Sequence, residues 1–314
     1  MKAKLTAQNL KGMWGTLLLP INNDDSINYQ LLNDEIDYLV SAKMDGIYSN
    51  GTAGEFHNQA EHEFDKVQEM LSRKCLAGDV RFQVGVSHPS PIISLERLKR
   101  SIHLMPDAFQ VILPDWVITT NEEQVIFLQR MAEAASGIPI VLYNPPHAKL
   151  VLKPEDYFKF KTAVPNLIGI KVAGGNEQWF DEMRNYATHL SVFVPGHLLA
   201  SGVQQKVGAG AYSNVACISP KGAQWWWDLM QTDMNKALSI QEQILQFFDE
   251  CIIPYIKEGF SNPALDKFLA AIGGWCPIGT RLRWPYKWIP VEDVKPAREI
   301  AKKYIAELLA FNDD

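Results

Sequence analysis

Eight short apolar runs recur along the first 215 residues, and longer amphipathic segments separate them. The runs have the length of buried strands and lie at 14–19, 45–50, 81–86, 108–113, 138–143, 167–172, 191–196 and 210–215. Strands that alternate with helices form parallel sheets that are covered on both faces. Eight of them predict a closed (β/α)₈ barrel, because a doubly wound open sheet would be expected to carry fewer strands over this length.

The segments between these runs carry apolar side chains at helical spacing. In 28–44 these side chains are Leu31, Leu32, Ile36, Leu39 and Val40. The segment 122–136 repeats the pattern, with Thr120 or Asn121 as a possible N-cap and Gly137 at its end. We therefore predict helices between the strands, as the barrel requires.

No strand-like run follows residue 230. The segments 234–259, 263–274 and 295–311 have helical patterns, and a loop rich in Pro and Trp at 275–290 precedes the last one. The sequence thus predicts an α/β chain, with a (β/α)₈ TIM barrel that carries the active site over 1–230. A C-terminal helical bundle is expected over 231–314, packed on the barrel.

Composition argues against several classes of partner. The formal net charge is −6 and no basic block occurs, so nucleic acid and anionic membranes are not expected to bind. No run approaches 18 apolar residues, and the first 20 residues lack an apolar core of signal-peptide length. The four cysteines are far apart and form no C-x-x-C pair, which is typical of a reducing compartment. We therefore expect a cytoplasmic protein.

One strand end carries a lysine, and active sites of (β/α)₈ barrels lie at the C-terminal ends of the strands. Lys171 interrupts the apolar run 167–172. A buried lysine is costly unless it is paired or deprotonated, and desolvation lowers its pKa so that the neutral amine can attack a carbonyl. An internal ion pair, or a position at the exposed lip of the strand, explains the residue equally well. This feature alone leaves both interpretations open.

Two other strand ends carry groups that suit carbonyl chemistry. Tyr143 ends the run 138–143, and its phenol can both donate and accept a proton. In the segment 50–56, NGTAGEF, glycines flank Thr52 and allow backbone N–H groups to converge on a carboxylate. Taken singly, each is explained more simply, as a core tyrosine and as an ordinary glycine-rich turn. The loop matches neither the dinucleotide fingerprint nor the P-loop.

Together these motifs resemble those of the dihydrodipicolinate synthase / N-acetylneuraminate lyase family, in the same order and on the same strands. The G-[ST]-[TS]-G-E loop of that family appears as Gly51-Thr52-Ala53-Gly54-Glu55. Its Y-N-x-P strand end appears as Tyr143-Asn144-Pro145-Pro146, and its G-x-K strand as Gly169-Ile170-Lys171. The resemblance covers most of the chain, and the combination is far more specific than any single motif.

The resemblance implies a class I lyase in which Lys171 forms an imine with the ketone of pyruvate or another 2-oxo acid, without a separate cofactor. Tyr143 would relay protons, and Thr52, with the backbone N–H groups of Thr52 and Ala53, would hold the carboxylate. A homotetramer (or dimer) is also implied. Further residues of the pocket are then expected at Gly51, Ala53, Gly196, Tyr212 and Ser213.

The sequence departs from the family pattern at positions that bear on the substrate. Ala53 replaces the second hydroxyl residue of the loop. After the run 108–113, lysine-pathway synthases have a proline and two tyrosines, one of which serves a neighbouring subunit; this chain has Pro114-Asp115-Trp116. Their arginine for a second carboxylate is replaced by Ala148, beside a Lys149 that lacks the bidentate fork. These differences argue against the synthase reaction.

Several other side chains are candidates for the pocket or its surroundings. His57, His88, His147 and His197 fall near strand ends, and His197 is the best candidate to contact the variable end of the substrate. Their spacing supports no metal site, so none is expected. Trp116 and Asp115 are expected either in the distal pocket or at a subunit interface. Trp225–Trp227 are expected in the core or an interface, and Glu55 is expected to fix the Gly-rich loop.

Four functional hypotheses remain at this stage. The first is an aldolase-type lyase that cleaves or forms a carbon–carbon bond of a sugar-acid-like 2-oxo acid. The second is a sugar-acid dehydratase that uses the same imine. The third is 4-hydroxy-tetrahydrodipicolinate synthase, which Trp116 and Ala148 disfavour. The fourth is a non-catalytic binding protein on the same fold, against which the joint presence of Lys171, Tyr143 and Thr52 argues.

Overall fold

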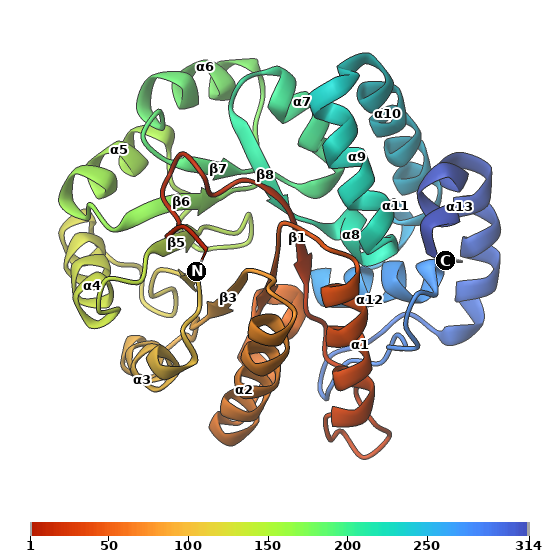
Figure 1. Ribbon diagram of the computed structural model, residues 1–314, viewed down its shortest axis with the longest axis horizontal. Coiled ribbons are helices and arrows are strands. Elements are labelled where there is room, and N and C mark those ends of the chain that lie inside the picture. Colours follow the sequence, from red (N-terminus) through yellow and green to blue (C-terminus); the bar gives the residue numbers. More distant parts are fainter. Residues whose placement is uncertain (1, 313–314) are drawn as a thin grey trace.

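Each of the eight predicted runs contributes a strand to one closed barrel. The computed structural model describes residues 2–312, and Figure 1 shows the strands at the centre of a ring of helices. The strands are parallel and pair in chain order, with β8 closing onto β1. They are β1 Gly12–Thr16, β2 Gly46–Ser49, β3 Phe82–Gly85, β4 Ala108–Val111, β5 Ile140–Tyr143, β6 Leu167–Lys171, β7 Ser191–Phe193 and β8 Gly208–Tyr212. The predicted (β/α)₈ fold is confirmed.

The first and last strands begin two residues earlier than predicted, and in both cases glycines explain the difference. Gly12 has φ +99°, and a Cβ at this position would lie 2.0 Å from a carboxylate oxygen of Asp45. That oxygen accepts a hydrogen bond from the Met13 N–H. In β8, a Cβ at Gly210 would lie 2.4 Å from the Gly12 carbonyl oxygen. Close approach of backbone and side chains requires glycine here, so the apolar pattern does not reach these strand starts.

Helices cover the outside of the barrel. They are α1 Tyr29–Ser41, α2 Glu61–Ala77, α3 Pro91–Ser101, α4 Asn121–Ala134, α5 Pro154–Ala163, α6 Glu177–Tyr186, α7 Leu199–Gln204, α8 Asn214–Ile218 and α9 Pro220–Thr232. The N-cap of α4 is Thr120, whose hydroxyl accepts from the Glu123 N–H while the Glu123 carboxylate accepts from the Thr120 N–H. This capping box settles the choice between Thr120 and Asn121.

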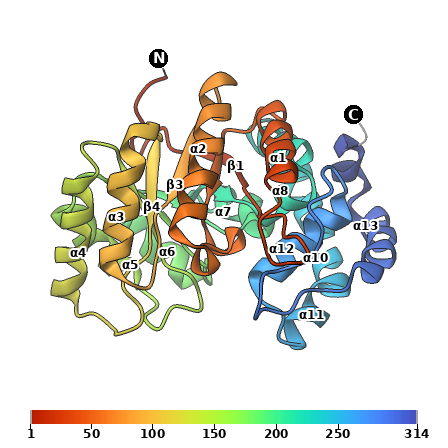
Figure 2. The same ribbon diagram turned by 90° about the horizontal axis from the view of Figure 1, so that it is seen from below.

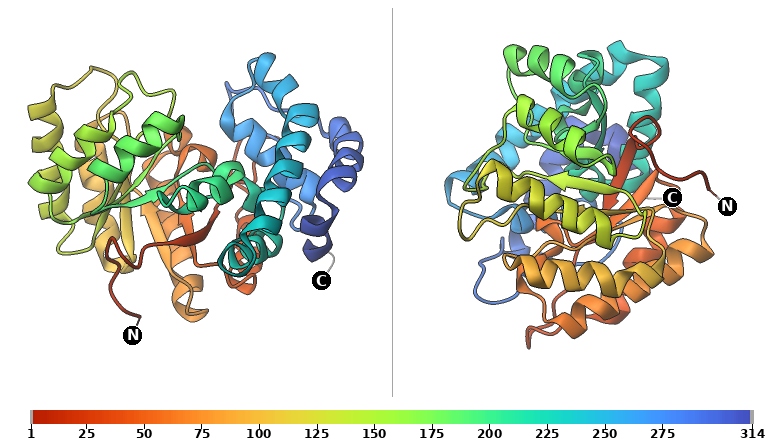
Figure 3. Two further views of the ribbon diagram at one scale, coloured as in Figure 1. Left: turned by 90° about the horizontal axis from the view of Figure 1, so that it is seen from above. Right: turned by 90° about the vertical axis from the view of Figure 1, so that its left-hand side faces the viewer.

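The interior of the barrel is largely aromatic. Trp14, Tyr48, Phe193 and Tyr212 form a buried cluster, and their paired ring centroids lie 4.4–6.5 Å apart. The N-terminal segment, drawn in dark red in Figure 3, runs past one end of the barrel. It adds Leu5 and Leu10 to the same cluster. This end is therefore filled with apolar side chains, and only the opposite end is open for chemistry.

The C-terminal segment is helical, as predicted, and it packs on the barrel. Its helices are α10 Met234–Cys251, α11 Ile253–Lys257, α12 Asn262–Gly273 and α13 Val294–Leu309. Figure 2 shows them together on the side of the barrel that carries α1 and α8. Helix α10 contacts α7 and α9, whereas α12 contacts α8 and the short 3₁₀ helix η1 (Thr52–Gly54) that follows β2. The division into a barrel over 1–230 and a bundle over 231–314 stays a prediction.

The prediction of one helix over 234–259 is wrong, because the helix breaks at Ile252. Pro254 lies in the first turn of α11. A proline inside a helix lacks the N–H for the helical hydrogen bond and clashes with the preceding turn, so a new helix begins there instead. Within the part of the chain that the structure describes, no helix is both long enough and apolar enough to span a membrane.

Candidate active site

Lys171 is the last residue of β6, and its amine lies in the open end of the barrel. The Nζ atom donates a hydrogen bond of 3.1 Å to the hydroxyl of Tyr48. It also lies 4.2 Å from the ring centroid of Tyr143 and 5.5 Å from that of Tyr212. None of the carboxylates in residues 2–312 forms an ion pair with it, so the internal ion pair considered as an alternative is not what accommodates this lysine.

This environment favours the neutral amine. Burial lowers the pKa of Lys171 to about 8, against an ordinary value of 10.5. The surrounding rings replace water, which disfavours the ammonium form, and the charge of Asp266 offsets this effect only in part. With such a pKa, roughly a tenth of the amine is neutral at pH 7. A neutral amine at the open end of a barrel is the form that can add to a carbonyl.

Tyr143 lies beside Lys171 because the two residues are paired in register at the ends of β5 and β6. The Tyr143 hydroxyl accepts a hydrogen bond of 3.4 Å from the hydroxyl of Thr52. Burial raises the pKa of Tyr143 to about 12. The phenol therefore stays protonated near neutral pH and can pass a proton on only while it receives another. The structure thus brings together Lys171, Tyr143 and Thr52, which come from three different strand ends.

The loop that carries Thr52 is held by buried charged groups. Glu55 has a left-handed backbone with φ 49°, and its side chain is buried. One carboxylate oxygen accepts a hydrogen bond of 2.6 Å from the Lys267 amine, and the other accepts one of 3.2 Å from the Arg283 N–H. Glu55 thus fixes the loop mainly through a buried ion pair to α12, and through only one backbone hydrogen bond.

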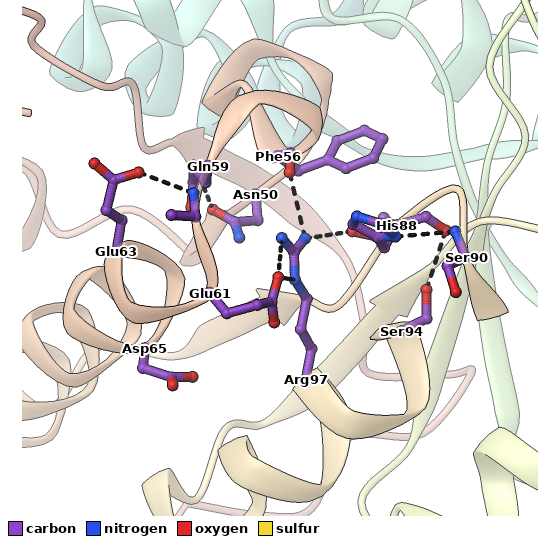
Figure 4. A network of polar contacts seen from close by, with 12 residues as sticks. Asn50, Phe56, Gln59, Glu61, Glu63, Asp65, His88, Ser90, Ser94 and Arg97 are labelled. Atoms are coloured by element: carbon purple, nitrogen blue, oxygen red, sulfur yellow. Dashed lines mark hydrogen bonds and ion pairs between the residues drawn. The ribbon is translucent and has the colours of Figure 1, made fainter. Parts of the chain in front are cut away.

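A second support comes from Arg97 on α3, which is fully buried. Figure 4 shows its guanidinium group between the loops that follow β2 and β3. It donates to the Phe56 and Ser87 carbonyl oxygens at 3.3 and 2.7 Å, and to the Glu61 carboxylate at 3.0 and 2.8 Å. Arg97 thereby joins the loops that follow β2 and β3. Thr52 is presented by a loop with little freedom to move.

A cavity of about 390 Å³ surrounds the Lys171 amine. Of the residues expected at the site from the sequence, it is lined by Thr52, Ala53, Tyr143, Lys171, Gly196, His197 and Tyr212. The polar residues that the sequence did not single out are Thr16, Tyr48, Asn214, Asn262 and Asp266. Apolar residues of α10 and α11, among them Phe248 and Ile253, form another part of the wall. The C-terminal helices therefore contribute to the site.

His197 is held in one orientation by Asn214. The Asn214 side-chain oxygen accepts a hydrogen bond of 3.1 Å from the His197 backbone N–H, and its amide nitrogen lies 2.9 Å from His197 Nδ1. Because that amide nitrogen can only donate, Nδ1 must accept, and the ring proton resides on Nε2. Burial lowers the pKa of His197 and so favours this neutral form. His197 can then offer one N–H donor to a molecule in the cavity.

Two of the expected pocket residues lie just outside the cavity. Gly51 packs under Tyr48, where a Cβ would lie 2.5 Å from the tyrosine ring. Ser213 is fully buried, and its hydroxyl accepts a hydrogen bond of 3.1 Å from the Ala216 N–H as the N-cap of α8. It also lies against Gly196, where a Cβ would come within 2.4 Å of its hydroxyl. Both residues shape the site from behind its walls.

A second cavity of about 310 Å³ adjoins the first and shares Thr52 and Tyr143 with it. Its lining includes Asp115, Trp116, His147, Ala148 and Lys149. The Lys149 N–H donates to the Asp115 carboxylate, and its amine donates to the Trp116 carbonyl oxygen, both at 2.8 Å. The Trp116 side chain is 80% exposed. The backbone N–H and the side-chain amine of Lys149 are thus both hydrogen-bonded to the loop before α4.

The remaining histidines are dispersed. His57 packs against Phe56 and Tyr286, and His88 Nδ1 accepts from the Ser90 N–H at 2.9 Å. Throughout residues 2–312, no group of three or more His, Cys, Asp or Glu side chains is arranged to hold a metal ion. Trp226 and Trp227 are buried, as expected for core residues, whereas Trp225 is half-buried. Trp284 and Trp288 are exposed, so of the three tryptophans near the 275–290 loop only Trp275 is buried.

Comparison with known proteins agrees with this geometry. The model of the dihydrodipicolinate synthetase family matches residues 9–297. The chain belongs to this family. It is 26% identical to the 4-hydroxy-tetrahydrodipicolinate synthase of Neisseria meningitidis serogroup C / serotype 2a over 281 residues, which cover 87% of this chain and 92% of that protein. It is 21% identical to the N-acetylneuraminate lyase of Citrobacter koseri, over 84% of this chain and 95% of that one.

Solved structures show the same fold. The dihydrodipicolinate synthase of Aquifex aeolicus superposes with a TM-score of 0.82 at 20% identity, covering 95% of this chain and 99% of that one. A catalytic-lysine mutant of the Ruminococcus gnavus sialic acid aldolase gives 0.82 at 18% identity, with coverages of 96% and 98%. The predicted family and its lyase class are confirmed. The relatives carry both synthase and lyase names, so family membership leaves the substrate open.

Proposed function

We propose that this member of the dihydrodipicolinate synthetase family forms an imine between Lys171 and a 2-oxo acid, and that it cleaves or forms a carbon–carbon bond of a sugar-acid-like substrate. The observation that carries the proposal is the Lys171 amine, which is hydrogen-bonded to Tyr48 and surrounded by tyrosines, in the cavity at the C-terminal ends of the strands. A protonated imine is an electron sink that stabilises the carbanion formed when the neighbouring bond breaks. The protein's own amine then serves as the electrophilic catalyst, and no separate cofactor is required.

The neighbouring groups supply the other functions that this chemistry needs. The backbone N–H groups of Thr52 and Ala53 donate no hydrogen bond within the described part of the chain, so they are free to hold the substrate carboxylate together with the Thr52 hydroxyl. The Tyr143 hydroxyl accepts a hydrogen bond from Thr52, and its ring lies 4.2 Å from the Lys171 amine, so Tyr143 can relay protons to the oxygen that leaves C2. His197 also lines the cavity and can offer its Nε2–H to the distal part of the substrate.

The second cavity bears on the choice among reactions. Ala148 offers no charge for a second carboxylate, and the neighbouring Lys149 amine is bonded to the Trp116 carbonyl oxygen. This arrangement favours a neutral, hydroxylated distal group over a dicarboxylate product. A lyase on sugar-acid-like 2-oxo acids therefore fits the site better than the synthase reaction does.

A panel of substrates tests this proposal. The enzyme is incubated with 2-oxo sugar acids of different chain length, and pyruvate release is scored separately from loss of water. Pyruvate release supports the aldolase, whereas water loss without pyruvate release replaces it by the dehydratase. Ready condensation of pyruvate with aspartate semialdehyde would instead identify a synthase and contradict the argument from Ala148.

We further propose that the chain assembles into a homotetramer (or dimer) in a reducing cytoplasm. An exposed apolar group made up of Trp116, Val117, Ile118 and Ile126 supports self-association, since such patches are unusual on monomers. The four cysteines, all buried and free, suit a reducing compartment.

A further inference from the structure

The Lys171 cavity contains a carboxylic acid to which no sequence motif pointed. Asp266 lies on α12, and among residues 2–312 it is the only Asp or Glu that lines this cavity. It forms no hydrogen bond and no ion pair with any residue in that range, whereas the adjacent Lys267 is fully paired with Glu55 and the Arg281 carbonyl oxygen. A half-buried acid without a structural partner therefore shares the cavity with the proposed nucleophile.

The position of Asp266 is fixed by its neighbours on α12. The buried Lys267–Glu55 ion pair joins this helix to the loop that presents Thr52. Ala264 and Leu265, on the N-terminal side, and Phe268 and Leu269, on the C-terminal side, are buried in the core. The same contacts that hold the Thr52 loop therefore hold this part of α12, and with it the backbone of Asp266, beside the cavity. Such support is what an acid–base group requires.

Lys171 and Asp266 influence each other without direct contact. Burial raises the pKa of Asp266 to about 7 and lowers that of Lys171 to about 8, and each charged form partly stabilises the other. The other titratable groups that respond to the Asp266 charge are Tyr48, Tyr143 and Cys217. All three have raised pKa values and stay neutral. Near neutral pH the amine and the acid therefore exchange protons within one coupled system.

Charge balance explains why such an acid would be needed. A neutral amine that becomes a protonated imine acquires a positive charge in a cavity whose walls are partly apolar. Tyr143 can relay a proton, but a buried phenolate is too unfavourable to remain as the counter-ion. Asp266 is the group in the cavity that can lose a proton and keep the negative charge near neutral pH.

We propose that Asp266 supplies the proton for dehydration of the Lys171 carbinolamine and then serves as the counter-ion of the iminium; this rests on the proposed imine function. The Lys171 nitrogen forms a bond to C2 while the carbonyl oxygen takes up a proton from the nitrogen through Tyr143. The C2–O bond then breaks, the hydroxyl leaves as water with the Asp266 proton, and the nitrogen lone pair forms the C=N bond. A neutral amine and a neutral acid thus become an iminium and a carboxylate, and hydrolysis reverses each step.

The test measures the rate at which pyruvate and borohydride trap Lys171, as a function of pH, in wild type, Asp266→Asn and a charge-matched control. For the control we choose Asp249→Asn, an exposed carboxylate of α10 outside the cavity. The wild-type rate is expected to rise as the amine deprotonates and to fall at higher pH as Asp266 loses its proton. In Asp266→Asn the trapping rate is expected to drop about 100-fold at pH 7, and its pH profile is expected to lose the falling limb. The Asp249→Asn control is expected to keep the wild-type rate and both limbs of the profile.

The remaining outcomes separate this proposal from the imine function itself. If Asp266→Asn traps pyruvate at the wild-type rate with both limbs of the profile, the role of Asp266 is refuted and the imine stands. If the wild type traps no pyruvate on Lys171, the imine function fails first. Asp266→Glu, which keeps a carboxylic acid, is expected to recover part of the rate and the falling limb. A glutamate variant that folds but behaves like the asparagine one contradicts the proposal.

Discussion

The hydroxyl of Tyr48 accepts a hydrogen bond from the Lys171 amine at 3.1 Å, and the ring of the same tyrosine occupies the space that a side chain at Gly51 would need. Tyr48 comes from β2 and Lys171 from β6, and these strands lie on opposite sides of the barrel. One tyrosine therefore connects the glycine of the proposed carboxylate-binding loop to the proposed nucleophile.

Tyr48→Phe removes the acceptor of the Lys171 hydrogen bond but keeps the ring against Gly51. A hydroxyl acceptor stabilises the ammonium form, so its loss is expected to lower the pKa of Lys171 further. The rising limb of the trapping profile with pyruvate should then move to lower pH, with the adduct still on Lys171. Tyr157→Phe, at a buried tyrosine of α5 outside the cavity, serves as the control and should leave the profile in place. An unmoved limb in Tyr48→Phe would show that this hydrogen bond does not tune the amine.

Lys171→Met is expected to raise the free energy of unfolding at neutral pH. The folded-state pKa of about 8 lies below the ordinary 10.5. Below pH 8 the cost of burying the charge is therefore fully present, and it disappears as the pH rises toward 10.5. Urea unfolding at pH 7 should show a gain of about 1–3 kcal/mol, which shrinks at pH 10. Equal effects at both pH values would contradict the shifted pKa.

The Lys267–Glu55 ion pair should be essential to stability. Lys267→Met leaves the Glu55 charge buried without its amine, and a loss of about 3–5 kcal/mol in unfolding free energy is expected. The double variant Glu55→Gln/Lys267→Met should lose clearly less than the sum of the two single variants. Lys302→Met, in an exposed pair with Glu299, is the matched control and should change stability by less than about 1 kcal/mol. Comparable losses at both pairs would refute this assignment.

The oligomer proposal has its own test. Trp116→Glu places a charge in the exposed apolar group, and is expected to lower the measured mass of the assembly at micromolar concentration. Light scattering or mass photometry gives the readout. Ile256→Glu, at an exposed apolar residue of α11 remote from that group, is the control. An assembly that survives Trp116→Glu unchanged, or a monomeric wild type, would exclude this surface as an interface.

Much of the barrel and part of the site could be predicted from the sequence. Buried parallel strands are continuous apolar runs, so all eight were recognisable, and Lys171 stood out because it interrupts one of them. Tyr143 and Thr52 followed because the carboxyl ends of barrel strands converge on one face. The resemblance to the family then joined them into one site.

The site residues that the sequence analysis did not predict are brought to the site by tertiary packing, which no local sequence pattern encodes. In the sequence, Tyr48 looks like an ordinary strand residue. Only the structure of the closed barrel shows that its hydroxyl reaches the Lys171 amine. Asp266 lies almost a hundred residues from Lys171, and α12 brings it to the cavity through contacts with η1. One signal was present: Asp266 and Lys267 are two charges in the otherwise apolar segment 263–272. A charged residue in an apolar helix suggests either an ion-pair partner or a chemical role. Lys267 has a partner in Glu55, and for Asp266 we propose a chemical role.

The most direct test of the central claim is covalent trapping of the imine. The protein is incubated with pyruvate, reduced with borohydride, weighed intact and then digested for peptide mapping. We predict a mass gain of one reduced pyruvate per chain, located on Lys171, abolished in Lys171→Arg and retained in Lys149→Ala. An unchanged mass, or an adduct on any other lysine, would contradict the account.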